Sequence, residues 1–268
     1  KVFGQEINAL TSAIARMNLY LNGVEDFSIV REDTLAHPAF IDGSKLRKFD
    51  IVLANPPYSI KTWNREAFMN DKWGRNFLGT PPQGRADYAF MQHIIASMNS
   101  NTGRCAILFP HGVLFRDEEK EIRKNLILQD DIECVIGLGP NLFYNSPMEA
   151  CIIICNKNKT PEMKNRILMI NAVHEVIRKN GESLLLDKHI EKISSTYHEK
   201  LEIEGFSKVT SLDEIKEKDY NLNISLYAYK GFLEISEEVL HDDAIENWQN
   251  SAALTKQAYN ELMTLINQ

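Results

Sequence analysis

Four consecutive residues, Asn55-Pro56-Pro57-Tyr58, follow an apolar segment at residues 49–54 and are suited to chemistry on an amine. The two prolines fix the backbone and remove two N–H donors, which leaves nearby carbonyl groups free to accept hydrogen bonds. The Asn55 side-chain oxygen and the Pro56 carbonyl then offer two acceptors directed at one point. Accepting both protons of a planar NH₂ group would draw its nitrogen lone pair out of conjugation and toward an electrophile. Tyr58 can stack on the plane that bears the amine; the alternative is a turn that ends a strand, with an exposed tyrosine.

Two acidic residues occupy comparable positions earlier in the chain. Glu6 ends an expected strand at residues 2–5, where a carboxylate can accept from both hydroxyls of a ribose. Asp33 follows an expected strand at residues 27–30, where a carboxylate can accept from an adenine amino group. Taken alone, each acid is better explained as a helix cap or a surface charge. Together with the amine acceptors they describe a nucleoside cofactor lying across one sheet edge, which is where open α/β sheets bind ligands.

The elements that must position these residues alternate between strand-like and helical segments. This alternation predicts an α/β fold, an open and mostly parallel sheet with helices on both faces. The helical spacing of Leu10, Ile14, Met17 and Leu21, with Gly23 as a stop, predicts the first helix. Strands are expected at residues 2–5, 27–30, 49–54, 105–109, 132–138, 150–155 and 167–170, and further helices at 86–98 and 118–128.

Residues 60–85 show no periodicity and are too long for an ordinary connection, which is typical of a functional loop. This segment follows the 55–58 turn and interleaves aromatic and basic residues, a pattern that fits a clamp facing DNA. We interpret His111 as structural, and three basic residues before the turn (Lys45, Arg47 and Lys48) as a solvated loop. The candidates for phosphate contact are Lys61, Arg65, Lys72, Arg75 and Arg85, beside Trp63 and Trp73.

Composition limits the function further. The 268 residues include 30 Lys and Arg against 37 Asp and Glu, a net charge of −7 that argues against wholesale electrostatic binding of nucleic acid. Most of this charge lies in residues 232–268, an acidic tail whose apolar residues recur at helical spacing. We expect that tail either to dock on a partner subunit or to fold back on its own domain. The remainder of the chain is close to neutral, which leaves room for a local basic groove.

The four cysteines and the overall hydropathy indicate where the protein works. Cys105, Cys134, Cys151 and Cys155 form no CxxC pair and have no histidine at metal-ligand spacing. We expect them to be buried, reduced thiols in a cytoplasmic protein, with no metal site. No apolar run approaches the roughly 20 residues that span a bilayer.

Several motifs in combination resemble known families. Gly4-Gln5-Glu6-Ile7-Asn8, Arg31-Glu32-Asp33-Thr34-Leu35 and the segment 49–58 resemble the adenine-specific, S-adenosylmethionine-dependent DNA methyltransferases. Gly84-Arg85-Ala86-Asp87-Tyr88-Ala89-Phe90 and three further segments, at residues 109–116, 136–144 and 219–224, resemble the modification (M) subunit of type I restriction-modification systems. The resemblance covers about residues 1–230.

This resemblance implies a Rossmann-like methyltransferase fold and S-adenosyl-L-methionine as cofactor. It implies that Glu6 binds the ribose of the cofactor and that Asp33 binds its adenine. It also implies that the target amine is bound by Asn55 and the Pro56 carbonyl, in a motif that Pro57 completes. The target base must leave the duplex to reach them. Ile7, Thr34, Leu35 and Asn55 complete the expected cofactor-binding residues. The residues expected to stack on the target base are Tyr58 and Phe143, and we prefer Phe143 to Tyr144 for the second position. Phe143 is equally well explained as a core residue beneath a turn.

The sequence departs from the family pattern at its start. The Gly-rich loop that precedes Gly4-Gln5-Glu6 in the family is absent, so we expect a fragment that lacks the first strand and methylates DNA poorly or not at all. The expected domains are a partial catalytic domain at residues 1–175, an extension at 176–231 and the acidic tail at 232–268.

The family implies double-stranded DNA, a specificity (S) subunit that reads the target sequence, a second M subunit and a restriction (R) subunit as partners. Two alternatives remain. A protein-glutamine methyltransferase is one, because a glutamine amide is also planar. A non-catalytic assembly module is the other, favoured by the absent loop.

Overall fold

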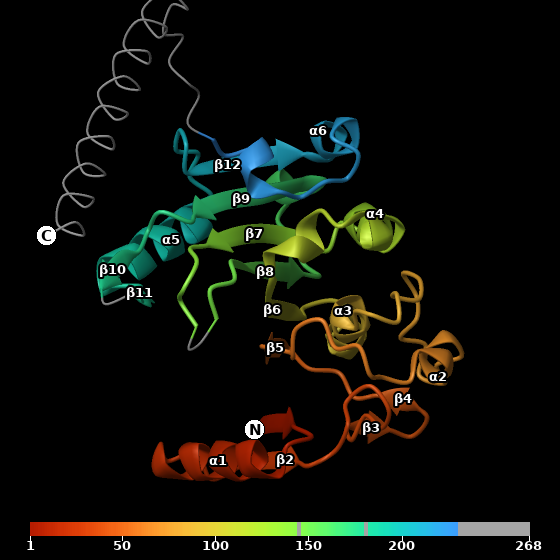
Figure 1. Ribbon diagram of the computed structural model, residues 1–268. Coiled ribbons are helices and arrows are strands. Elements are labelled where there is room, and N and C mark those ends of the chain that lie inside the picture. Colours follow the sequence, from red (N-terminus) through yellow and green to blue (C-terminus); the bar gives the residue numbers. More distant parts are fainter. Residues whose placement is uncertain (144–145, 180–181, 230–268) are drawn as a thin grey trace, which may run out of the picture. The chain divides into compact units, whose positions relative to one another are not determined.

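A computed structural model describes residues 1–143, 146–179 and 182–229 (Figure 1). Residues Lys1–Tyr229 form one compact unit. The acidic helix expected at residues 232–268 lies outside the described residues, as does Tyr144. No helix in the described part of the chain is long and apolar enough to cross a membrane.

Six strands form the main sheet, in the order β12-β9-β7-β8-β6-β5. The pairs β5–β6 and β7–β9 are parallel, whereas β8 is antiparallel to both of its neighbours and β12 is antiparallel to β9. Four of the six strands run in one direction, but β8 and β12 are reversed, so three of the five pairings are antiparallel and the sheet is mixed, where a mostly parallel one was expected. The strands are β5 (Ile51–Ala54), β6 (Arg104–Pro110), β7 (Ile132–Leu138), β8 (Ala150–Asn156), β9 (Arg166–Ala172) and β12 (Ser207–Ser211).

Apolar side chains bury both faces of this sheet. On one face, Met91 of α3 (Asp87–Ser97) and Leu126 of α4 (Lys120–Leu128) belong to the same buried cluster as Phe109 and Ile153. On the other face, Tyr197 of α5 (Asp187–Glu199) is clustered with Ile136 and Ile170. Because β7 is buried along its whole length, its sequence is an unbroken apolar run apart from Glu133 and Gly137. The other helical elements that follow α3 in the described residues are α6 (Leu212–Glu217) and four short 3₁₀ turns, at His111–Leu114, Asp117–Glu119, Pro161–Met163 and Ile224–Leu226.

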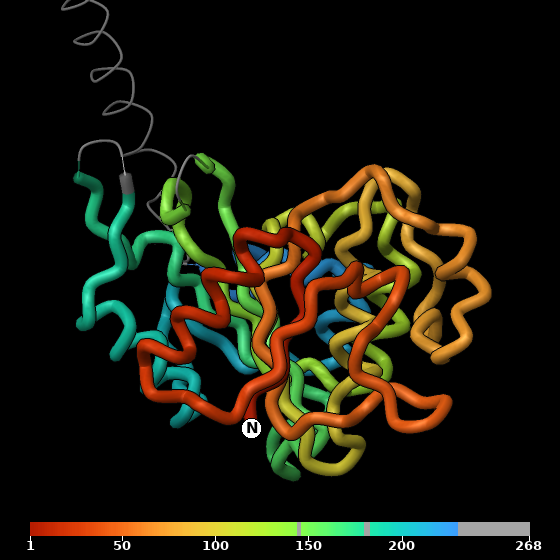
Figure 2. The backbone as a smooth tube through the Cα atoms, turned by 90° about the horizontal axis from the view of Figure 1, so that it is seen from below, coloured from red at the N-terminus to blue at the C-terminus, as the bar shows by residue number. Residues whose placement is uncertain are grey.

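The N-terminal segment forms a separate parallel pair of strands, β1 (Val2–Gln5) and β2 (Phe27–Val30), connected by α1 (Ala9–Leu21). Asn8 caps α1 by accepting from the N–H groups of Leu10 and Thr11. The predicted apolar stripe of α1 is exposed, with Leu10 70% and Leu21 76% accessible. Figure 2 follows the backbone from α1, in red, through the small hairpin of β3 (Ile41–Asp42) and β4 (Lys45–Leu46) to β5, in orange.

Three aromatic rings connect the β1–β2 pair to the main sheet. Phe3 of β1 lies 5.2 Å from Phe40 and 5.4 Å from Phe49, measured between ring centroids. Phe49 precedes β5 and donates its N–H to the carbonyl of Ser97, at the end of α3. This aromatic cluster therefore fixes where β1 and β5 begin, and so where their carboxyl ends lie.

Several elements differ from the sequence-based expectation. The irregular segment at residues 60–85 contains a short helix, α2 (Arg65–Met69), with Asn64 as its N-cap. Five strands were not expected: β3, β4, β10 (Ile177–Lys179), β11 (Glu182–Leu184) and β12. Because β12 pairs with β9, the six-stranded sheet includes residues from both the expected catalytic domain (1–175) and the expected extension (176–231).

Candidate functional site

The structure brings Glu6 and Asp33 to the same edge of a sheet. The parallel β1–β2 ladder pairs Gln5 with Val30, and the Glu6 N–H continues it by donating to the Val30 carbonyl at 3.1 Å. The Gln5 side chain then fastens the Asp33 loop, because its amide donates to the His37 carbonyl at 2.8 Å and accepts from the Ala39 N–H at 3.0 Å. The two acids thus follow adjacent parallel strands, as the sequence predicted.

Each acid uses one carboxylate oxygen to order its own loop. Glu6 Oε1 accepts from the Asn8 N–H at 2.7 Å, and Asp33 Oδ1 accepts from the N–H groups of Leu35 and Ala36 at 2.8 and 3.1 Å. Within the described residues, Glu6 Oε2 and Asp33 Oδ2 make no hydrogen bond. The role in ordering the loop and the role in binding a ligand are therefore compatible, since within the described residues each side chain keeps a free acceptor for a hydroxyl or an amino group.

Arg75 holds the loop after Asp33 from beneath. Its guanidinium is only 1% exposed, pairs with the buried Asp71 carboxylate at 2.6 Å, and donates to the carbonyls of Thr34 and Leu35 at 2.9 and 2.7 Å. The expectation that Arg75 contacts DNA phosphate is wrong, because long-range partners bury this charge. We assign to Arg75 instead the role of supporting the Asp33 loop.

The 55–58 turn follows β5 at the carboxyl end of that strand. Asn55 is exposed and makes no side-chain hydrogen bond with any described residue, whereas Pro56 is buried. The only described partner of β5 is β6, and its Leu53 side chain is 77% exposed. A groove of about 330 Å³ adjoins the turn and is lined by Leu53, Ala54, Asn55, Ala106, Leu108 and Ile152. The Asn55 amide is therefore free to meet a ligand.

A buried ionic cluster lies directly behind this turn. Ser59, at a left-handed φ of 49°, donates its N–H to Asp87 Oδ1 at 2.8 Å and its hydroxyl to Asp87 Oδ2 at 3.3 Å. Arg116 donates to the same Oδ2 at 2.9 Å and to Glu119 Oε2 at 3.4 Å. Both carboxylates are fully buried. Two acids thus share one arginine.

This arrangement raises the pKa of Glu119 to about 7, chiefly because burial disfavours the ionised form. Arg116 and Arg85 oppose this rise and Asp87 adds to it, and the Tyr88 hydroxyl also faces the cluster. Between the ordinary value of 4.5 and about 7, the folded protein holds a proton that the unfolded chain has released. The contribution of Glu119 to the unfolding free energy therefore falls as pH rises through that window, by about 3 kcal/mol at roughly 1.4 kcal/mol per unit of pKa.

We expect Glu119→Gln to abolish this part of the pH dependence. Unfolding by urea, followed for the wild type and the variant at pH 5 and pH 8, measures the difference. The variant should gain stability relative to the wild type at pH 8, by about the amount given above. Equal pH dependence in the two proteins would show that Glu119 titrates normally.

The aromatic candidates are placed differently from one another. Tyr58 is half-buried beside Asp87 and Cys151, and burial raises the pKa of its hydroxyl, so the phenol stays protonated. Phe143 is half-buried and packs against the apolar cluster of β7 and β9. Its role in stacking on a base remains a prediction.

His111 is three-quarters or more buried at the end of β6, and burial lowers its pKa. Its Nδ1 lies 3.5 Å from the Glu149 carboxylate, and its buried Nε2 has no hydrogen-bond partner. The structure thus places it in a packed environment, with its backbone N–H bonded to the Glu149 carbonyl.

The other basic residues of segment 60–85 are nearer the surface. Lys61 and Lys72 are exposed, whereas Arg65 donates to the Pro81 carbonyl and Arg85 pairs with Glu118. The Trp63 indole donates to the Gln83 carbonyl, so it packs within the segment. Contact between this segment and DNA therefore remains a prediction that rests on fewer residues.

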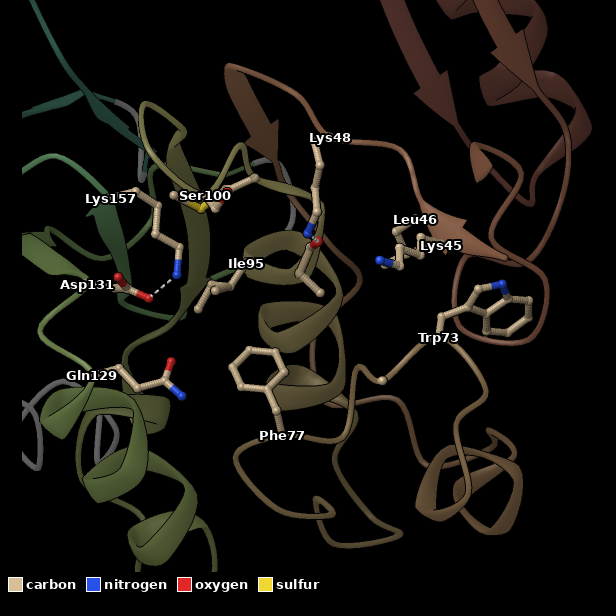
Figure 3. Close-up of a pocket in the computed structure, with 13 residues that line it drawn as sticks. Lys45, Leu46, Lys48, Trp73, Phe77, Ile95, Ser100, Gln129, Asp131 and Lys157 are labelled. Atoms are coloured by element: carbon tan, nitrogen blue, oxygen red, sulfur yellow. Dashed lines mark hydrogen bonds and ion pairs between the residues drawn. The ribbon is translucent and has the colours of Figure 1, made fainter. Parts of the chain in front are cut away.

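A larger pocket, of about 670 Å³, lies at the opposite ends of the strands (Figure 3). Lys48 and Ser100 line it and precede β5 and β6, whereas Asn55 follows β5. Two of its three ammonium groups already have partners, since Lys48 donates to the Ala96 carbonyl and Lys157 to Asp131. The pocket is thus separate from the three loops described above.

All four cysteines are free and buried, as expected. Burial raises the pKa of the Cys134 and Cys151 thiols, so both stay protonated. In the described part of the chain, no group of three or more His, Cys, Asp or Glu side chains is placed to hold a metal ion.

Comparison with known proteins gives consistent matches. A family model described as N-6 DNA methylase matches residues 1–234. The type I restriction enzyme MjaVII methylase subunit of Methanocaldococcus jannaschii is 33% identical over 99% of the chain, and the HindI methylase subunit of Haemophilus influenzae is 32% identical over 96%. These matches cover 46% and 58% of the two relatives, so the chain spans about half their length.

A solved structure extends the comparison to the fold. The type I restriction-modification methyltransferase subunit from Streptococcus thermophilus matches 84% of the chain with a TM-score of 0.77 and 38% identity, over 48% of its own length. The EcoKI M protein has a TM-score of 0.61 at 18% identity, which is a likeness of fold alone.

Proposed function

The chain belongs to the N-6 DNA methylase family, and on that basis we propose that it transfers a methyl group from S-adenosyl-L-methionine to the exocyclic amine of adenine in DNA. The observation that carries the proposal is the 55–58 turn. Its Asn55 amide is exposed and has no hydrogen bond to a described residue, and it follows a parallel strand as Glu6 and Asp33 do. Carboxylates with a free oxygen fit a nucleoside cofactor, and a free amide oxygen fits an amine.

The cofactor would supply a methyl group on a sulfonium, which is electrophilic without a metal. Glu6 Oε2 would accept from the ribose hydroxyls and Asp33 Oδ2 from the adenine amino group. Asn55 Oδ1 and the Pro56 carbonyl would accept both protons of the target amine, which localises the lone pair on nitrogen. The amine loses one proton after methylation, so the reaction needs no strong base before transfer.

The target adenine must be flipped out of the duplex, because its amine is otherwise paired. Tyr58 is the candidate platform for the flipped base, and stacking on an aromatic ring contributes about 1–3 kcal/mol per base. Phe143 is the candidate for the opposite wall.

We also propose the partners. The relatives are named as subunits of type I restriction enzymes. We infer that the chain works with a specificity subunit that reads the DNA sequence, a second modification subunit and a restriction subunit, in the cytoplasm. The near-neutral charge of residues 1–231 fits a protein that depends on another subunit for much of its DNA contact.

Titration calorimetry with S-adenosylmethionine tests the cofactor site. Because the relatives are about twice as long, both this chain and the gene product that contains it should be titrated. We expect Asp33→Asn to weaken binding about tenfold to a hundredfold, since a hydrogen bond to a charged group contributes roughly 1.5–3 kcal/mol. Asparagine keeps the Oδ1 acceptor that orders the loop and replaces Oδ2 by a donor.

Asp42→Asn is the matched control, because Asp42 is exposed and its carboxylate pairs, among the described residues, only with Arg47. It should leave the dissociation constant unchanged. Wild-type affinity in Asp33→Asn would remove Asp33 from the site, and no binding by either wild-type protein would remove the cofactor itself.

A further inference from the structure

The 55–58 turn ends in a backbone conformation that its own sequence does not favour. Ser59 has φ +49°, a left-handed conformation that is sterically strained for a non-glycine residue. Serine has no special tolerance for this region, and Pro57 and Tyr58 before it give no reason for it. Something outside the turn must therefore hold Ser59, and with it the direction in which the preceding residues point.

The Asp87 carboxylate is the group that contacts Ser59. It accepts from both the N–H and the hydroxyl of Ser59, and no other described side chain bonds to this residue. Asp87 is the first residue of α3, where a negative charge is stabilised by the helix dipole. The next residues, Tyr88 and Ala89, are fully packed in the core, so the carboxylate sits on a rigid element.

A fully buried carboxylate is costly unless it is paired, and Arg116 provides the pair. Gly112 makes room for the guanidinium, because a Cβ at that position would lie 2.5 Å from Arg116 Nε. The cluster thus links the end of β6, through Arg116 and Asp87, to the turn after β5.

We propose that Asp87, oriented by Arg116, is a positioning residue for methyl transfer: it fixes Ser59 and so aims Asn55 and the Pro56 carbonyl at the target amine. This inference rests on the proposed function and extends it to a residue that touches neither cofactor nor base. The proposal explains why the segment Gly84-Arg85-Ala86-Asp87-Tyr88 contains an aspartate. Packing alone does not explain it, since an apolar residue would fill the same space without a buried charge.

Steady-state methylation of adenine-containing DNA by the gene product, together with cofactor titration, tests the proposal. We expect Asp87→Ala to lower kcat about a hundredfold, the scale of a 1 Å misplacement of a reacting group. The affinity for S-adenosylmethionine should not change, because Glu6 and Asp33 lie on other loops. A merely structural role would reduce affinity and kcat together.

Gly112→Ala is the second variant and keeps every charge. It should displace Arg116 and lower kcat in the same direction with unchanged cofactor affinity, and it decides the matter if Asp87→Ala does not fold. Asp117→Ala is the control, because Asp117 is exposed beside Arg116 and bonds to no described side chain.

The outcomes separate the two proposals. Wild-type kcat in Asp87→Ala, or in Gly112→Ala where Asp87→Ala is unfolded, would overturn the positioning role while Asn55→Ala still lowers kcat about 10²–10³-fold. An inactive wild type would overturn the proposed function instead, and a fall of less than tenfold in Asn55→Ala would remove that amide from it.

Discussion

Asn55→Ala is expected to lower the rate of methyl transfer about 10²–10³-fold while the protein stays folded and binds its cofactor. The size follows from the removal of one of two preorganised acceptors at the reacting amine, which typically costs this much in kcat. Because the Asn55 side chain is exposed and forms no hydrogen bond with a described residue, its loss removes nothing from the core. The effect should therefore fall on kcat rather than on stability.

The measurement is single-turnover transfer of a labelled methyl group to an adenine-containing duplex by the gene product. Asn101→Ala is the matched control, an exposed asparagine in the turn before β6, at the other end of the sheet. A fall of less than tenfold in Asn55→Ala would mean that this amide is not an acceptor for the target amine. An equal fall in Asn101→Ala would mean that the assay reports on folding.

Arg75→Ala is expected to lower the free energy of unfolding by about 3–5 kcal/mol, the usual result of removing one partner from a buried ion pair. The variant leaves the Asp71 carboxylate, 2% exposed, without its charge partner. It also leaves the carbonyls of Thr34 and Leu35 without their donor. Lysine should not rescue the variant, because one ammonium cannot reproduce the planar fork that reaches these acceptors together.

Urea unfolding at neutral pH measures the change. Arg47→Ala supplies the control, because the Arg47–Asp42 pair is exposed and surface ion pairs contribute little to stability. Equal losses in the two variants would show that the Arg75 pair is solvated. A large loss in Arg75→Ala would confirm that this arginine supports the Asp33 loop and faces no phosphate.

The segments that could be predicted from sequence are those whose structure follows from the pattern of residues within the segment and directly beside it. The strands Val2–Gln5, Phe27–Val30 and Ile132–Leu138 have the bounds that the sequence predicted, because each is a short, predominantly β-forming segment between polar or turn residues. The three loops of the site follow from the same pattern, since a polar residue directly after a strand lies at the carboxyl end of that strand.

The rest depends on long-range partners. An apolar run carries no sign of its direction, so the reversal of β8 could not be read from its residues. The polar strand β12 is recognisable only from its pairing with β9. Arg75 resembles a surface charge until Asp71, Thr34 and Leu35 are brought around it, and the contact between Asp87 and Ser59 joins residues 28 positions apart.

The central claim is that the 55–58 turn delivers a methyl group to the exocyclic amine of adenine. The most direct test is mass spectrometry of the nucleosides from a duplex incubated with the gene product, its specificity subunit and S-adenosylmethionine carrying a deuterated methyl group. The account predicts label on the N6 position of deoxyadenosine, appearing about 10²–10³-fold more slowly with Asn55→Ala. Label on a protein glutamine instead, or no label in nucleosides or protein, would contradict it and favour the protein methyltransferase or the assembly module.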